Sequence, residues 1–104
     1  MSFPFTDLSA VKRRPAVVLV VDGEDVVLCG VTSKLSRRSD AVSLEQRGMA
    51  EGRLPKPSEI RPFKVFTIHR ALVNSVVGRL SEETLERVVG LLVTALRSGH
   101  SGSR

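Results

Sequence analysis

Residues 12–34 decide the fold and read KRRPAVVLVVDGEDVVLCGVTSK. An apolar run, 16–21, leads into the polar turn Asp22-Gly23-Glu24-Asp25, and a second apolar run, 26–31, follows it. Two runs rich in β-branched residues on either side of an Asp-Gly pair are a strong signal for a β-hairpin. Both runs are apolar at nearly every position, which predicts strands that are buried on both faces.

The turn also predicts which residues lie opposite each other at the open end of the hairpin. If Asp22 faces Asp25, Pro15 lies opposite Thr32 and Arg14 lies opposite Ser33. A three-residue loop would shift this register by one and would still leave Arg14 beside the Thr-Ser pair. Directly opposed Cβ atoms are about 4.5–5.5 Å apart. The open end therefore gathers guanidinium, hydroxyl and ammonium groups, which suits an oxyanion or phosphate site; a polar rim that merely closes the hairpin is the alternative.

Length and composition indicate one small domain. The chain has 104 residues, 41% of them hydrophobic, so we expect a single domain over residues 1–97 and a disordered tail over 98–104. No apolar run approaches the ~18–20 residues of a membrane helix, and no signal-peptide pattern opens the chain. The single cysteine, Cys29, excludes an internal disulfide and favours the cytoplasm. We expect Cys29 to be a small core residue of its strand.

The chain is basic. It contains 16 Lys and Arg residues against 11 Asp and Glu residues, which gives a net charge of +5 and an isoelectric point of about 10.4. A basic chain of this size favours a polyanionic partner, and nucleic acid is the commonest. A merely solvated basic surface is the alternative.

The other predicted strands are less clear. Pro4 argues against a central strand, so the N-terminal segment is expected as an edge strand or an extended arm. Residues 35–53 are polar and predict a mobile loop, with only 41–44 weakly strand-like. Residues 60–68 alternate imperfectly and predict a strand in which Pro62 marks a bulge or an edge. Residues 72–77 predict one more short strand.

The C-terminal part of the chain predicts a helix. Ser81 is a good N-cap, and the two glutamates that follow it suit the positive end of the helix dipole. Apolar residues recur with helical spacing and form one face, namely Leu85, Val88, Val89, Leu92, Ala95 and Leu96. The predicted class is mainly β with a C-terminal helix, arranged as a compact antiparallel barrel or curled sheet on which the helix packs.

Conventional catalytic and cofactor motifs are missing from the sequence. Its only histidines are His69 and His100, and no cluster has the spacing of metal ligands. It contains neither a glycine-rich phosphate loop nor a recognisable serine-hydrolase elbow. We therefore expect no metal and no cofactor, and any catalysis must use Arg, Thr, Ser, Lys or acidic side chains.

Residues 3–9 (FPFTDLS) followed by 12–19 (KRRPAVVL) resemble the N-terminal half of the MazF/PemK family of toxin ribonucleases. The second half agrees at VTSK (31–34), GRLPKPS (52–58), RP (61–62), FTI (66–68) and GRLS (78–81). The resemblance implies an SH3-like barrel with a C-terminal helix, a homodimer and metal-independent cleavage of single-stranded RNA at short sequences. It also implies a cognate antitoxin whose disordered, acidic segment occupies the RNA groove.

The resemblance also implies which residues form the site. The family's catalytic arginine, which precedes the proline of its R-P-x-[VL]-[VL] strand, matches Arg14, and its catalytic threonine matches Thr32. Phosphate contacts are expected from Arg13, Ser33, Lys34, Arg61 and Lys64. Phe63 stands where some members carry an aspartate, so no general base is inherited from that position. Phe63 or Phe66 could stack a base, with burial in the core as the alternative.

The implied chemistry uses a nucleophile supplied by the RNA. A 2′-OH attacks the adjacent phosphorus, displaces the 5′-oxygen and leaves a 2′,3′-cyclic phosphate. Arg14 suits charge stabilisation because its planar fork binds two phosphate oxygens, and Thr32 can donate to a non-bridging oxygen. Two other classes remain open: a small barrel, inactive or degenerate, that binds nucleic acid without cleaving it, and a toxin of related fold with a target such as gyrase.

Overall fold

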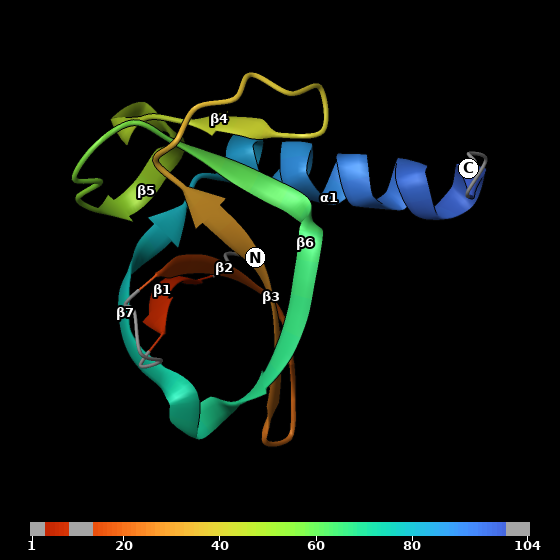
Figure 1. The fold of residues 1–104 in the computed structure, drawn as a ribbon. Coiled ribbons are helices and arrows are strands. Elements are labelled where there is room, and N and C mark those ends of the chain that lie inside the picture. Colours follow the sequence, from red (N-terminus) through yellow and green to blue (C-terminus); the bar gives the residue numbers. More distant parts are fainter. Residues whose placement is uncertain (1–3, 9–13, 100–104) are drawn as a thin grey trace.

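The computed structural model describes residues 4–8 and 14–99, and these form a curled antiparallel sheet with one helix at the C-terminal end (Figure 1). The sheet order is β4-β6-β3-β2-β1-β7-β5. The strands are β1 (Pro4–Leu8), β2 (Pro15–Asp22), β3 (Asp25–Thr32), β4 (Val42–Leu44), β5 (Met49–Gly52), β6 (Ser58–His69) and β7 (Val73–Leu80). Two 3₁₀ turns, Gln46–Gly48 and Arg70–Leu72, and helix α1 (Glu82–Ser98) complete the described chain. The predicted class, mainly β with a curled half-barrel and a C-terminal helix, is confirmed.

The hairpin predicted from residues 12–34 is present as β2 and β3. Asp22 faces Asp25, and Gly23 adopts φ +63°, a left-handed conformation that glycine enters without steric cost. Burial on both faces is confirmed for the half of the hairpin away from the turn, where alternate residues enter two different apolar clusters; near the turn, Val20 and Val21 are 52% and 60% exposed. Val17, Cys29 and Val31 belong to a larger cluster that includes residues of β4, β5, β6, β7 and α1. Ala16, Val18, Val26 and Leu28 form a smaller cluster on the opposite face, against Phe66, Ile68 and Val73.

The predicted register at the open end of the hairpin is wrong by one residue. Val20 pairs with Val27, but Val18 pairs with Leu28, so Leu19 is an extra residue on β2. This bulge shifts every later pair, and Ala16 lies opposite Gly30. Continuing the shifted register by two residues brings Arg14, rather than Pro15, level with Thr32.

Three further expectations need correction. β1 is not an edge strand, because it lies between β2 and β7; Pro4 is tolerated there because it is the first residue of the strand. The expected loop 35–53 contains a strand that the sequence did not reveal, β5, which pairs with β7. The strand predicted at 72–77 extends to Leu80. The bulge expected at Pro62 is present, since Cys29 pairs with Val65 while Gly30 pairs with Arg61.

Helix α1 begins as predicted and packs by its first half. The Thr84 N–H donates to the Ser81 side chain at 3.2 Å, which is an N-cap hydrogen bond. Thr84, Leu85 and Val88 are buried, whereas Val89, Val93 and Leu96 are exposed, and the second half of the helix extends beyond the sheet (Figure 1). The helix includes Ser98, where the tail was expected to begin, and residues 100–104 lie outside the described part.

Cys29 is fully buried, as predicted. Burial raises the pKa of its thiol to about 12, so the side chain stays protonated at neutral pH and is no nucleophile. Within the described residues, α1 is too short and too polar to cross a membrane.

Candidate functional site

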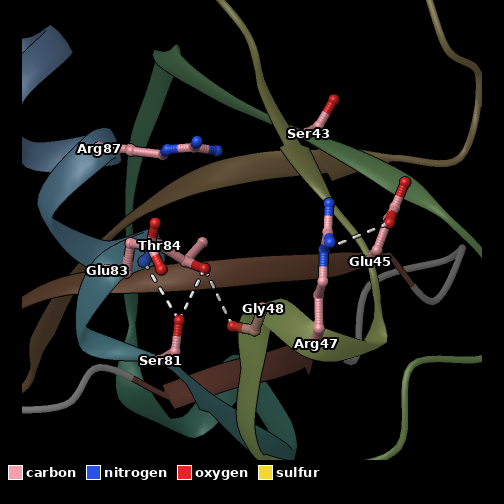
Figure 2. A pocket seen from close by; sticks show the side chains of 8 residues that line it. All are labelled: Ser43, Glu45, Arg47, Gly48, Ser81, Glu83, Thr84 and Arg87. Carbon is pink, nitrogen blue, oxygen red and sulfur yellow. Dashed lines mark hydrogen bonds and ion pairs between the residues drawn. The ribbon is translucent and has the colours of Figure 1, made fainter.

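A hollow lies where α1 begins, and several of its lining residues contact one another (Figure 2). It encloses about 500 Å³ between β4, the Gln46–Gly48 turn and the first turn of α1. The Thr84 hydroxyl contacts Ser81 Oγ at 2.9 Å and donates to the Gly48 carbonyl at 3.1 Å. Two arginines of the lining are matched by two glutamates, and Glu45 lies 3.7 Å from Arg47. The hollow therefore joins the start of α1 to the Gln46–Gly48 turn, and its positive and negative side chains balance in number.

A second hollow, the central pocket, lies at the open end of the β2–β3 hairpin. It has a volume of about 300 Å³ and is lined by Arg14, Pro15, Gly30, Val31, Thr32, Arg61, Lys64 and Phe66. Three elements supply its polar side chains: the start of β2, the end of β3 and the bulged part of β6. The structure thus brings Arg14 and Thr32 together with Arg61 and Lys64. Three cations around one hydroxyl suit a bound anion.

The hydroxyl of Thr32 is oriented by its own chain. The backbone N–H of Lys34 donates to Thr32 Oγ1 at 3.1 Å. This bond uses an acceptor site of the oxygen and leaves the hydroxyl proton free to bind another acceptor. Thr32 can therefore donate to an anion in the central pocket.

Two other pockets adjoin the central pocket. The Pro55 pocket shares Pro15 with it, has about 300 Å³, and is lined by Pro15, Ser33, Arg53, Leu54, Pro55, Lys56, Ser58 and Val77. The Phe63 pocket shares Arg61 and Lys64 with it, has about 260 Å³, and is lined by Arg38, Asp40, Arg61, Phe63 and Lys64. Every one of the three pockets carries at least two cations. Together they form a row, here called the cationic groove, that could contact several phosphates of one strand.

The predicted site residues are distributed over this groove. Arg14, Thr32, Arg61 and Lys64 line the central pocket, and Ser33 lines the Pro55 pocket instead. Lys34 has an exposed side chain and contributes its backbone N–H to Thr32. Arg13 lies outside the described residues. Phe63 is 48% exposed, so burial in the core is wrong for it, whereas Phe66 is half-buried against the smaller apolar cluster.

Sequence reasoning missed Glu59, which holds the loop that follows Thr32. Its side chain is 97% buried, since only 3% of its surface is exposed. One carboxylate oxygen accepts from the N–H groups of Ser36 and Arg37 at 2.9 and 2.7 Å, and the other accepts from Ser36 Oγ at 2.9 Å. The bond from Arg37 first, and then those from Ser36, hold the pKa of Glu59 below its ordinary value although burial acts the other way. These three hydrogen bonds are here called the Glu59 clamp. Glu59 also pairs with Thr32 across the sheet, so the clamp lies directly beside the central pocket.

The loop held by Glu59 carries an ion pair at the end of the groove. Arg38 donates to Asp40 through Nε at 2.9 Å and through Nη2 at 3.0 Å. This two-point hydrogen bond is the main reason that the pKa of Asp40 lies below its ordinary value, and the charge of Arg61 adds to the effect. Only the three-dimensional structure could reveal these contacts, because residues 35–53 show no clear periodicity.

His69 lies at the opposite, closed end of the hairpin. It pairs with Asp25 across the sheet, its Nδ1 accepts from the N–H of Ala71 at 3.0 Å, and its Nε2 lies 3.2 Å from Glu24. These contacts are structural. Within residues 4–8 and 14–99 there is no group of three or more His, Cys, Asp or Glu side chains suited to a metal ion.

Comparisons with known proteins agree with this fold. A family model described as "PemK-like, MazF-like toxin of type II toxin-antitoxin system" matches residues 4–96. The structure is similar to the Mycobacterium tuberculosis toxin MazF-mt6, with a TM-score of 0.75 and 17% identity over 90% of this chain and 96% of that one. It is also similar to an endoribonuclease solved with its cognate antitoxin from a mycobacterial species, with a TM-score of 0.70 and 17% identity over 92% and 91%. No protein with a curated function matches the sequence.

Glu59→Gln should loosen the loop after Thr32, because a carboxamide replaces an anionic acceptor of three hydrogen bonds by a neutral one. Amide hydrogen exchange of Ser36 and Arg37 should become about tenfold faster or more. Glu45→Gln, at an exposed glutamate, should leave both amides unchanged. In the unmutated protein the protection should be complete above the ordinary glutamate pKa of about 4.3 and should be lost as the pH falls through the lower pKa of the folded state. Equal protection in Glu59→Gln would contradict the clamp.

Proposed function

The chain belongs to the PemK-like, MazF-like toxin family of type II toxin–antitoxin systems, and from this premise we propose that it is an endoribonuclease that cleaves single-stranded RNA in the central pocket. The observation that carries the proposal is that Arg14 and Thr32 line one pocket with Arg61 and Lys64. Cations and an oriented hydroxyl supply what a phosphodiester needs when its charge increases in the transition state. We propose the cytoplasm, where RNA is available, as its location.

In the proposed reaction the 2′-OH of the substrate attacks the neighbouring phosphorus. The P–O5′ bond breaks, the 2′-OH proton is lost, the 5′-oxygen gains a proton, and the products are a 2′,3′-cyclic phosphate and a 5′-hydroxyl. Arg14 stabilises the added negative charge, because a guanidinium stays ionised and binds two phosphate oxygens at once. Thr32 donates to a non-bridging oxygen, since its lone pair already accepts from the Lys34 N–H. Arg61 and Lys64 bind the phosphate next to the one that reacts.

The cationic groove would hold the nucleotides on either side of the scissile bond. Arg53 and Lys56 line the pocket on one side of the central pocket, and Arg38, Arg61 and Lys64 line the pocket on the other. Phosphate contacts of this kind give affinity without reading sequence. The same cations would attract an acidic segment of a cognate antitoxin, so we propose that antitoxin and RNA compete for the groove. A structural relative has been solved with its cognate antitoxin, which supports such a partner here.

We also propose that the protein is a homodimer that uses the uncovered side of α1. Val89, Val93 and Leu96 recur at helical spacing and are 37%, 42% and 79% exposed. Val65, on β6, is 47% exposed as well. Apolar side chains exposed along one face of a helix are typical of surfaces that a partner covers.

Arg14→Ala and Thr32→Ala should each lower the rate of RNA cleavage about 10²-fold or more, because each removes a group that stabilises the transition state. Thr32→Ser keeps the hydroxyl and should retain most of the activity. Arg47→Ala, in the hollow at the start of α1, is the matched control and should cleave normally. The assay is cleavage of a mixed-sequence RNA by variants with unchanged thermal unfolding. Full activity in Arg14→Ala would remove the central assignment.

A single 2′-deoxy substitution on the 5′ side of the scissile bond should abolish cleavage, because it removes the nucleophile. Binding of that oligonucleotide should persist, since phosphate contacts dominate the affinity of single strands. Excess EDTA should leave the rate unchanged, and the products should carry a cyclic phosphate and a 5′-hydroxyl. Mass spectrometry of the products and fluorescence anisotropy measure these outcomes. Cleavage of the deoxy-substituted strand would show that water is the nucleophile and would contradict the proposed reaction.

Sedimentation equilibrium at micromolar concentration should give twice the 11.3 kDa mass of the chain. Leu96→Glu should shift the protein towards the single-chain mass, because it places a charge in an interface of at least about 1,200 Å². Thr94→Glu, on the opposite side of the same helix, should leave the dimer intact. A single-chain mass for the unmutated protein would exclude the dimer.

A further inference from the structure

The Phe63 pocket has a construction that phosphate binding does not explain. Phe63 lies in the stretch 62–64 of β6, which has no counterpart on β3, and the bulge leaves its ring 48% exposed. An exposed aromatic ring between cations is a typical surface for stacking a nucleobase. The pocket also contains a carboxylate, Asp40, which would repel a phosphate.

Asp40 is held in place but keeps one free acceptor site. Its two oxygens each accept one hydrogen bond from Arg38, at 2.9 and 3.0 Å. An ionised carboxylate has about four acceptor positions, and the backbone N–H of Asp40 uses a third, so one position remains. Arg38 keeps the pKa of Asp40 low, and the group is therefore anionic at neutral pH. The loop on which both residues lie is fixed by Glu59 through Ser36 and Arg37.

We propose that the Phe63 pocket binds the nucleobase adjacent to the scissile phosphate and selects guanine. The proposal rests on the proposed function, because it places the pocket beside the reacting bond. Its closeness to that bond follows from Arg61 and Lys64, which line both the Phe63 pocket and the central pocket. An RNA strand with one phosphate bound at Arg61 and Lys64 would place the base of the neighbouring nucleotide at Phe63.

Guanine is the base whose edge matches this pocket. Its N1–H and N2–H groups are neighbouring donors, and both can donate to the one free acceptor position of the carboxylate. Uracil and adenine each offer one donor position flanked by acceptors, which the carboxylate would repel, and the cytosine edge offers only its amino group. The volume of about 260 Å³ lies just below the range of about 300–1,000 Å³ of drug-sized sites, as expected for a single base.

The test is cleavage of a random-sequence RNA pool, with the 5′ ends of the products sequenced. The unmutated protein should favour guanine at one position that flanks the scissile bond. Asp40→Asn, which replaces an acceptor by a donor, should reduce this preference about tenfold or more at that position only. Asp22→Asn, at the exposed hairpin turn, is the matched control and should keep the preference. Protection of the Ser36 and Arg37 amides in Asp40→Asn shows whether the loop is intact.

A binding measurement gives an independent test. Phe63→Ala should weaken binding of an uncleavable 2′-deoxy oligonucleotide about tenfold, because it removes a stacking surface, and Phe63→Tyr should restore it. Leu72→Ala, at an equally exposed apolar residue, should have no effect. Replacing the preferred guanine by inosine, which lacks the 2-amino group, should weaken binding to the unmutated protein but not to Asp40→Asn.

The outcomes separate this proposal from the proposed function. Cleavage without a guanine preference beside the scissile bond, or with a preference that Asp40→Asn leaves unchanged, would overturn the guanine pocket and leave the ribonuclease intact. No cleavage of any RNA by the unmutated protein would overturn the proposed function. In that case, equal binding of the guanine and inosine oligonucleotides would overturn the pocket as well, and weaker binding of inosine would support it.

Discussion

Burial of the β2–β3 hairpin on both of its faces is the constraint on which the rest of the structure depends. Val17 and Cys29 enter the larger apolar cluster, while Val18 and Leu28 enter the smaller one on the opposite side. Where both faces are enclosed, from Ala16 to Val18 on β2 and at the paired residues of β3, polar side chains have no place, because an unpaired polar group in a core is costly. Polar residues are therefore confined to the two ends of the hairpin. The turn occupies one end, and the central pocket occupies the other.

Two bulges in the strands orient the side chains of the cationic groove. The extra residue at Leu19 shifts β2 by one and brings Arg14 level with Thr32. The unpaired stretch 62–64 of β6 turns Phe63 outwards and places Arg61 and Lys64 in both the central and the Phe63 pockets. Bulges commonly redirect side chains next to functional sites, and here two bulges on neighbouring parts of one sheet serve the same groove.

The loop after Thr32 owes its order to one buried carboxylate. A loop rich in serine and arginine has little apolar surface with which to pack, so its position must come from hydrogen bonds. Glu59 supplies them from the neighbouring strand, through three bonds to Ser36 and Arg37. Arg37 has φ +58°, a backbone conformation that non-glycine residues rarely adopt, and the bonds to Glu59 hold it there. The groove is thus built from parts that are rigid for different reasons: core packing for the strands and a charged clamp for the loop.

The sequence by itself determined the hairpin, the burial of its inner half on both faces, the N-capped helix and the closeness of Arg14 to Thr32 and Ser33, because each follows from local periodicity and turn chemistry. The resemblance in its motifs already indicated the toxin family. Only the tertiary structure decided the interior position of β1, the strand β5, the exposure of Phe63 and the roles of Glu59 and Asp40. Bulges and buried carboxylates leave no periodic signal, since they depend on which residues from distant segments meet. Pairing with β7 orders β5, and contact with residues 36 and 37 gives Glu59 its function.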